Sequence, residues 1–141
     1  MIQVKFKKLN PNAIPFKYTR TNDACMDIYC LDKFRLIPLE TKIVSTGIAL
    51  EIPEDYEGII RGRSGLSAEG LLVHIGTIES EYRGDVGIVI TNVSNRVQVI
   101  QAGSRIAQFT IKPVIKIELI DAIELSSTER GAAGYGSSGL K

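Results

Sequence analysis

The side chains best suited to chemistry lie together in one stretch, residues 76–84, which reads Gly-Thr-Ile-Glu-Ser-Glu-Tyr-Arg-Gly. Two carboxylates, a phenol and a guanidinium fall within positions 79–83. They could supply a proton acceptor, a flat apolar ring and a cation for a bound anion. Apolar, β-branched residues flank the stretch at 71–73 and 86–90, so we predict a β-hairpin with a polar tip. A solvated loop between two strands is the alternative that this stretch alone leaves open.

Residues 61–66 contain a second candidate site, for phosphate. Arg63 and Ser64 stand at the expected start of a helical turn over 64–69, with Ser64 as its candidate cap. The free N–H groups and the dipole at the start of a helix favour an anion. An arginine, a serine and a glycine in a row are also common in ordinary loops, so this signal is weak by itself.

Residues 103–108 predict a strand that begins after a turn and carries polar side chains. Strict alternation would place Arg105 and Ala107 on one face, with Ile106 and Gln108 on the other. Gln108 beside an apolar residue indicates either a buried amide with a specific partner or an exposed position at a sheet edge.

The C-terminal residues 126–139 are rich in glycine and small hydroxyls and have almost nothing to bury. Such a segment cannot offset its own ordering entropy, so a mobile terminus is the simplest interpretation. Arg130 and Tyr135 are unusual among these residues, and free backbone N–H groups can wrap an anion. A lid that orders over a phosphorylated ligand is the sharper hypothesis.

Composition limits the classes of function. The 141 residues predict one domain, and 17 basic against 16 acidic side chains leave a formal charge of +1. So small a charge gives no basic field of the kind that drives binding to nucleic acid. We also expect no signal peptide and no membrane span, because no continuous apolar start and no run of ~20 apolar residues occurs. These features predict a cytoplasmic or otherwise intracellular protein.

Cys25 and Cys30 lie in a segment that we expect to be a strand, where they would stand roughly 16 Å apart on opposite faces. That geometry excludes a bridge between them and predicts buried, reduced thiols. The single histidine, His74, cannot form a metal cluster and is expected on the flank of the hairpin.

Short strands dominate the rest of the chain. Turn signals recur about every 8 to 12 residues and helical periodicity is almost absent, which favours a sandwich, jelly roll or barrel. An irregular connection is expected over 10–22, and the strand at 2–6 should be half-buried. The predicted strands are 2–6, 26–30, 34–37, 41–52, 56–62, 86–91, 97–101, 105–112 and 115–119.

Five short stretches, taken in order, resemble the five motifs of the homotrimeric dUTPase family. Their joint order is far more specific than any one motif, and they run from residue 24 to residue 139, essentially the whole chain. The family implies a β jelly roll over 1–125 that assembles as a trimer with active sites at subunit interfaces. Its C-terminal arm, here 126–141, would lie over a site that the other two subunits build. The stretches are 24–28, 62–65, 76–84, 105–108 and 130–139.

The resemblance implies hydrolysis of dUTP to dUMP and pyrophosphate, which limits uracil incorporation into DNA and supplies dUMP for thymidylate synthesis. Glu79 would be the general base that activates a water for attack on the α-phosphorus. Asp27 would hold Mg²⁺ through coordinated water, and Arg130 would act as an arginine finger. The Tyr82 ring would pack on the sugar, where a ribose 2′-hydroxyl would clash.

The same resemblance implies how the rest of dUTP is bound. Backbone groups of the hairpin would read the uracil edge, and the arm would stack on the base and wrap the terminal phosphates. The residues concerned are Gly76, Thr77 and Ile78 for the uracil edge, Arg63, Ser64, Gly65 and Gln108 for the phosphate chain, and Tyr135, Gly136, Ser137 and Ser138 in the arm.

The chain departs from the family pattern at two positions that bear on activity. Glu79 stands where aspartate is usual, and its extra methylene moves the carboxylate by about an ångström, which can cost ~10²-fold in rate. Ala133 stands where glycine is usual and would resist a positive φ. We therefore expect an active but slower enzyme. Two alternatives stay open, a catalytically weakened trimer that binds dUTP and regulates other proteins, and a relative of the dCTP deaminases.

Overall fold

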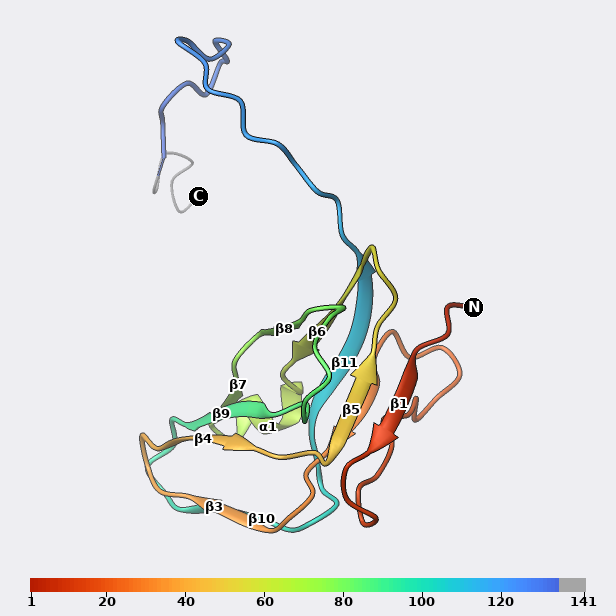
Figure 1. Cartoon of the computed structure of the whole chain (residues 1–141). Coiled ribbons are helices and arrows are strands. Elements are labelled where there is room, and N and C mark those ends of the chain that lie inside the picture. The colour runs from red at the N-terminus through yellow and green to blue at the C-terminus, as the bar shows by residue number, and fades with distance from the viewer. Residues whose placement is uncertain (135–141) are drawn as a thin grey trace.

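The computed structural model describes residues 1–134, which form short strands and one helix (Figure 1). The predicted all-β architecture with a single short helical turn is confirmed. The elements are β1 (Lys5–Lys8), β2 (Met26–Tyr29), β3 (Phe34–Leu36), β4 (Thr41–Val44), β5 (Ile48–Glu51), β6 (Tyr56–Arg61), α1 (Ser64–Ala68), β7 (Leu71–Val73), β8 (Gly76–Ile78), β9 (Ile88–Asn92), β10 (Gln98–Ile100) and β11 (Arg105–Pro113).

The strands form two main sheets and two further pairs, all antiparallel. β2, β11, β6 and β8 make a four-stranded sheet in that order, and β4, β9 and β7 make a three-stranded sheet. β1 pairs with β5, and β3 pairs with β10. Strands that are distant in sequence become neighbours, as in a jelly roll.

One hydrophobic core joins the two main sheets. Ile28, Ile60 and Phe109 enter it from the four-stranded sheet, and Leu71 and Ile90 from the three-stranded sheet. These five side chains are at most 5% exposed. Because a slip of one residue would turn each of them to the other face, the core fixes the register of the strands that carry the site.

The hairpin predicted around 76–84 is only partly correct. Its flanks do pair, since Leu71 lies opposite Asn92 and Val73 opposite Ile90. The segment between them does not continue the hairpin, because β8 leaves β7 and pairs with β6 in the other sheet. The polar residues 79–85 therefore connect the two sheets.

Two other strand predictions need correction. The predicted strand 41–52 divides into β4 and β5, because the chain turns at Gly47, whose φ of 67° suits glycine. The predicted strand 115–119 does not form. Ile115, Ile117 and Leu119 are 79% to 90% exposed, and Figure 1 shows this segment leaving the body after β11. A strand needs a partner along one edge, and this segment has none among residues 1–134.

Only residues 5 and 6 of the predicted strand 2–6 belong to β1, and this strand is exposed rather than half-buried. Phe6 is 54% exposed although β1 pairs with β5 over its whole length. Ile2, Val4 and Phe6 instead line one side of an apolar groove of about 530 Å³. Phe16, Tyr18 and residues of β2, β5 and β11 line the rest of this groove.

Three smaller expectations can be compared with the structure. Both cysteines are free, as predicted; Cys30 is buried, whereas Cys25 is only half-buried. His74 directly follows β7, where its Nε2 lies 2.8 Å from Thr91 Oγ1, so its predicted place on the flank is confirmed. Within residues 1–134, the one helix, α1, is too short to cross a membrane.

Candidate functional site

Asp27 is the centre of a compact polar cluster. It lies in β2, is 5% exposed, and its backbone N–H donates to Lys17 O at 2.9 Å. Thr19 Oγ1 donates to Asp27 Oδ2 at 2.6 Å, and Arg105 Nη1 donates to the same oxygen at 3.2 Å. Arg63 Nε lies 3.5 Å from Asp27 Oδ1. The cluster therefore holds two arginine side chains at one buried carboxylate, which has partners on both oxygens.

The surroundings of Asp27 keep it ionised. Burial raises the pKa of the Asp27 carboxyl, but the hydrogen bonds from Thr19 and Arg105 and the charges of Arg63 and Arg105 lower it. The balance leaves the pKa of Asp27 below its ordinary value. Burial, together with the negative charge of Asp27, raises the pKa of the neighbouring Tyr29. Asp27 is thus an anion and Tyr29 a neutral phenol at neutral pH.

Gln108 joins this cluster because of an irregularity in β11. Arg105 pairs with Tyr29 and Ala107 with Ile28, so two steps on β11 match one step on β2. This β-bulge interrupts the alternation, and the predicted division into faces is wrong. Ile106 and Ala107 are both buried, and Arg105 and Gln108 both face the cluster around Asp27.

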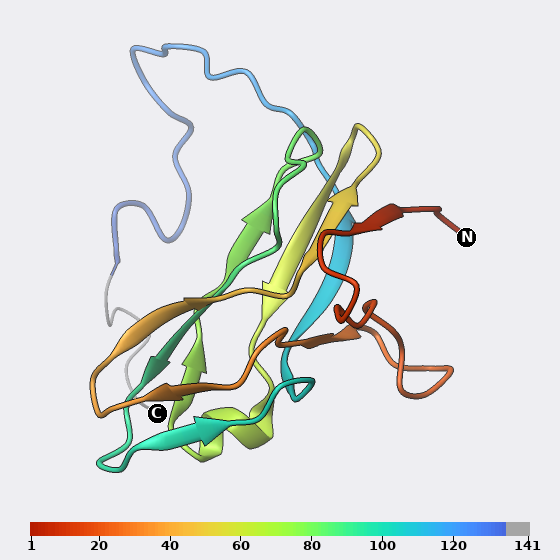
Figure 2. The ribbon, with the colours of Figure 1, turned by 60° about the horizontal axis from the view of Figure 1, so that its bottom comes forward.

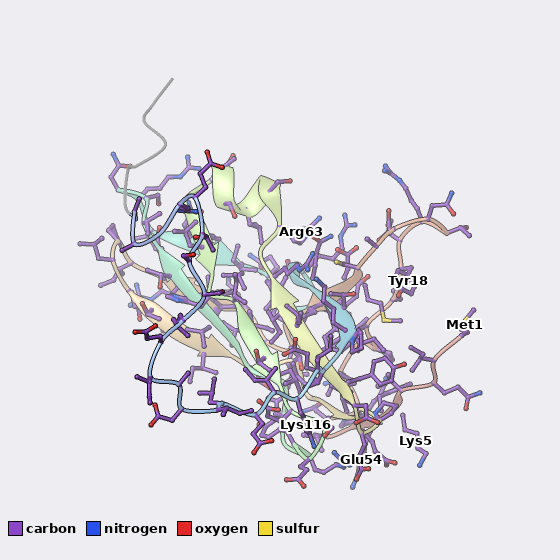
Figure 3. The ribbon with its side chains drawn as sticks, turned by 90° about the horizontal axis from the view of Figure 1, so that it is seen from above. Met1, Lys5, Tyr18, Glu54, Arg63 and Lys116 are labelled. Atoms are coloured by element: carbon purple, nitrogen blue, oxygen red, sulfur yellow. The ribbon has the colours of Figure 1, made fainter. Side chains whose placement is uncertain are left out.

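The cluster forms the floor of a polar cleft of about 440 Å³. Three arginines and two aspartates line it, so the cleft carries an excess of positive charge. Figure 3 shows one of them, Arg63, on the side of the molecule next to α1. Guanidinium groups gathered in this way suit the oxygens of a phosphate chain. The lining residues are Thr19, Arg20, Asp23, Ala24, Cys25, Asp27, Arg63, Arg105 and Gln108.

The donor groups around Asp27 fit Mg²⁺ through water. Oδ2 accepts hydrogen bonds from Thr19 and Arg105, whereas Oδ1 has the longer contact with Arg63 and can accept a hydrogen bond from a metal-bound water. The part of the chain that the structure describes has no group of three His, Cys, Asp or Glu side chains that could enclose a metal. Mg²⁺ keeps several waters and often binds one or two carboxylates together with substrate phosphates, so one carboxylate is sufficient here.

The second predicted phosphate-binding group adjoins this cleft. Arg63 is the N-cap residue of α1 and makes no side-chain cap bond, so the prediction that Ser64 is the cap is wrong. The helix begins at Ser64, where the predicted range of the helical turn began. The Arg63 side chain turns to the cleft, where Nη1 donates to Arg105 O at 2.9 Å. Ser64 and Gly65 are exposed in the first turn, and Gly65 has open space on its side-chain face.

The residues predicted to bind the nucleoside and to supply the general base lie in and directly after β8. Gly76, Thr77 and Ile78 form β8, and Glu79 follows as an exposed residue. The chain then turns, since Tyr82 N–H donates to Glu79 O at 3.0 Å.

The Tyr82 ring has a defined place in this turn. Its hydroxyl donates to Asp85 O at 2.8 Å, and the side chain of Tyr82 remains 44% exposed. A Cβ on Gly84 would lie 2.4 Å from the Tyr82 hydroxyl, so only glycine at position 84 allows the ring to lie there. The turn therefore carries an exposed glutamate and a partly exposed aromatic ring whose hydroxyl is fixed at Asp85.

Glu79 and Asp27 occupy opposite corners of the four-stranded sheet. Gln108 pairs with both Asp27 and Arg61, and the residue before Arg61 faces Gly76. Glu79 is therefore three strands across from Asp27 and four residues along. Spacings of ~4.8 Å per strand and ~3.3 Å per residue give a separation of about 20 Å. Figure 2 shows the turn after β8 and helix α1, whose N-cap is Arg63, at opposite ends of the molecule.

The described part of the C-terminal arm is exposed and has local contacts. Arg130 Nε donates to Ala133 O at 3.0 Å, and Gly131 adopts a φ of 50°. Ala133 does not have a positive φ, so the strain expected there is absent from this conformation. The remaining predicted residues of the arm lie outside the described residues; they are Tyr135, Gly136, Ser137 and Ser138.

Two residues that contact the predicted site residues Asp27 and Tyr82 were not themselves predicted from the sequence. Thr19 bonds Asp27 from the connection that precedes β2, eight residues away. Asp85 anchors the turn that carries Tyr82, and its side chain accepts a hydrogen bond from Ser45, forty residues away. No pattern in the polar connection over 10–22 indicated that Thr19 would contact Asp27. In the sequence, Asp85 looks like an ordinary loop aspartate.

Comparison with known proteins gives a consistent result. The model of the family described as dUTPase matches residues 12–139. A deoxyuridine 5′-triphosphate nucleotidohydrolase of Hydrogenobaculum sp. is 44% identical over 140 residues, which cover 96% of each chain. The protein of the same name from Nautilia profundicola is 40% identical and covers 98% of this chain and 99% of its own.

Solved structures agree with the sequences. The dUTPase of Staphylococcus bacteriophage 80alpha with dUpNHpp has a TM-score of 0.92 and 30% identity, and the match covers 99% of this chain and all of that one. The dUTPase of phage phi11 of S. aureus, in a mutant form whose structure concerns the coordination of a structural Mg(II) ion, has a TM-score of 0.84 at 26% identity. These matches confirm the predicted jelly-roll-like fold of the dUTPase type.

Proposed function

The chain belongs to the dUTPase family and hydrolyses dUTP to dUMP and pyrophosphate, and we propose that it does so at sites shared between the subunits of a homotrimer. One observation carries this proposal. The phosphate-binding group at Asp27 and the general base Glu79 lie about 20 Å apart within one chain, too far to act on one α-phosphorus. A second subunit can bring its Glu79 to the first subunit's cleft.

Exposed apolar surface supports the association of subunits. The segment after Val114 carries large apolar side chains that alternate with polar ones and are exposed in the single chain. The groove lined by Ile2, Val4 and Phe6 offers apolar surface of similar kind. Contact with a strand of another copy of the chain could bury the apolar side chains of each surface. In this arrangement residues 1–125 form the β domain of each subunit, and the arm 126–141 reaches a neighbouring site.

The reaction we propose needs no covalent intermediate. Glu79 accepts a proton from a water, whose oxygen attacks the α-phosphorus in line with the bond to the bridging oxygen. That bond breaks and pyrophosphate leaves with the electron pair, so the products are dUMP and pyrophosphate. Arg63 and Arg130 stabilise the charge that develops on the phosphate oxygens. Ser64, Gly65 and Gln108 position the phosphate chain.

Asp27 is the residue that would hold Mg²⁺, through coordinated water at Oδ1. When bound, the ion neutralises charge on the triphosphate and orients its oxygens. Thr19 and Arg105 keep the Asp27 carboxylate ionised and fixed in one orientation. The chain thus provides a prepared acceptor for the metal's water ligands.

Recognition of the nucleoside is assigned to the turn after β8. We propose that the Tyr82 ring packs on the deoxyribose and excludes a ribose 2′-hydroxyl. Backbone groups of Gly76, Thr77 and Ile78 read the uracil edge. Tyr135 of the arm stacks on the base, and Gly136, Ser137 and Ser138 wrap the terminal phosphates. The cytoplasmic location stays a prediction, with which the free thiols of Cys25 and Cys30 agree.

Substrate choice and metal dependence can be tested together. Pyrophosphate release should be fast with dUTP and Mg²⁺ and far slower with dTTP, dCTP and UTP at the same concentration. A chelator should slow the dUTP reaction strongly, because the triphosphate loses its main counterion. Pyrophosphate release that is unchanged in the chelator would refute the metal-binding role proposed for Asp27. Tight dUTP binding without pyrophosphate release would identify the chain as a regulatory binding protein.

A further inference from the structure

The Tyr82 ring is held by contacts that extend beyond the site described above. Its hydroxyl donates to the backbone oxygen of Asp85 at 2.8 Å, while the ring lies against Gly84. All three residues belong to the connection between β8 and β9. The place of the ring therefore depends on how the backbone at Asp85 is held.

Asp85 is held by the corner between β4 and β5. Ser45 Oγ donates to Asp85 Oδ2 at 2.5 Å, and Thr46 Oγ1 donates to Asp85 Oδ1 at 3.2 Å. The next residue, Val86, donates its N–H to Ile48 O at 2.8 Å. Two hydroxyls, one on each carboxylate oxygen, and one backbone bond thus fix the end of the turn.

The two hydroxyls are themselves fixed in place. Ser45 Oγ accepts the N–H of Gly47 at 3.2 Å, and Thr46 Oγ1 accepts the N–H of Ile48 at 3.2 Å. Thr46 is 0% exposed and Ile48 is 1% exposed, so the corner is part of the core. Each hydroxyl accepts from the backbone and donates to Asp85, which leaves it a single orientation.

We propose that Ser45, Thr46 and Asp85 form a positioning clamp that sets the discrimination between deoxyribose and ribose by fixing the Tyr82 ring. The inference rests on the proposed function, in which this ring packs on the sugar. The clamp residues act through Tyr82 and are not catalytic residues. A ring displaced by about an ångström leaves space for a 2′-hydroxyl, so loss of the clamp favours UTP relative to dUTP.

The ratio of kcat/KM for dUTP to that for UTP is the measurement that tests the clamp. Asp85→Ala should lower this ratio about tenfold or more, and the double variant Ser45→Ala/Thr46→Val should lower it by a similar factor. Combining all three changes should lower it no further, because the three residues act as a unit. Thr41→Val is the matched control: this hydroxyl of β4 bonds Thr91 at 2.7 Å, outside the clamp, and the ratio should not change.

Three results would overturn the clamp. They are an unchanged ratio in folded variants, equal losses for dUTP and UTP, and effects that add in the triple variant. Equal losses are what a purely structural role predicts. If Asp85→Ala does not fold, Ser45→Ala alone keeps the Thr46 bond and must still lower the ratio; no change there would overturn the clamp as well.

Variants of Tyr82 separate the clamp from the proposed function. Tyr82→Ala should lower the ratio at least as far as Asp85→Ala does. Tyr82→Phe keeps the ring but loses the bond to Asp85 O, and it should give an intermediate ratio. An unchanged ratio in Tyr82→Ala would refute the role proposed for the ring, whereas a lowered ratio there with none in Asp85→Ala would refute the clamp alone.

Discussion

Replacing Glu79 with glutamine is expected to lower kcat for dUTP by about 10²- to 10⁴-fold, the usual contribution of a general base. Glutamine keeps the size and polarity of the side chain but cannot take a proton from the attacking water. Because Glu79 is exposed after β8, the change should leave the fold and the melting temperature unaltered. Steady-state pyrophosphate release at saturating dUTP and Mg²⁺ measures the effect on kcat.

Glu81 provides a matched control in the same turn. It is also an exposed glutamate, two residues further on, and Glu81→Gln should keep kcat near that of the unaltered protein. An equal fall in both variants, or none in Glu79→Gln, would show that Glu79 is not the base. Glu79→Asp addresses the departure from the family: a rise in kcat is expected if the longer side chain slows the reaction, and a fall shows that the turn is already fitted to glutamate.

Ending the chain after Leu125 is expected to lower kcat/KM for dUTP by about 10³-fold or more, the scale attributed to an arginine finger. The truncation removes Arg130 and the rest of the arm, which makes only local contacts in the described residues. The body should therefore fold and associate as before. Pyrophosphate release reports the loss, and the mass of the assembly in solution checks that the oligomer is retained.

A single substitution tests whether the loss of Arg130 causes the expected fall in kcat/KM of the truncated chain. Arg130→Ala in the full chain should account for most of the truncation's effect, whereas Arg35→Ala, an exposed arginine of β3 remote from the cleft, should have little. Full activity in the truncated chain would contradict the role of the arm altogether.

The sequence predicted those parts of the fold that depend on local patterns. Alternation located most strands, and the short apolar runs at 71–73 and 86–90 correctly indicated paired flanks. Alternation failed to predict the structure where the pairing of strands distant in the sequence determines it. The departure of β8 to β6 is a choice of partner that neither strand's sequence encodes alone, and β-pairing is set by the whole sheet.

The candidate site also combines features that the sequence indicates with features that depend on strand pairing. Asp27 and Gln108 were recognised through family motifs, but the bulge at Ile106 that turns Arg105 and Gln108 to the same cleft had no signal in the alternation. The 115–119 prediction shows the opposite failure. Its apolar alternation is real, yet a strand forms only beside a partner, and one chain offers none to this segment within the described residues.

The central claim, that each active site draws residues from more than one subunit, is tested most directly by mixing two inactive proteins. Asp27→Asn and Glu79→Gln subunits carry their lesions about 20 Å apart in one chain. They should be refolded together at equal concentration, and mixed trimers isolated through two different affinity tags.

We expect the isolated mixed trimers to recover about one third of the full activity, because in a trimer that contains both variants one of the three sites combines an intact Asp27 with an intact Glu79. Each variant alone, and the two combined without exchange of subunits, should remain inactive. A site built within one chain would contain a lesion in every copy, so no recovery in verified mixed trimers would contradict the account.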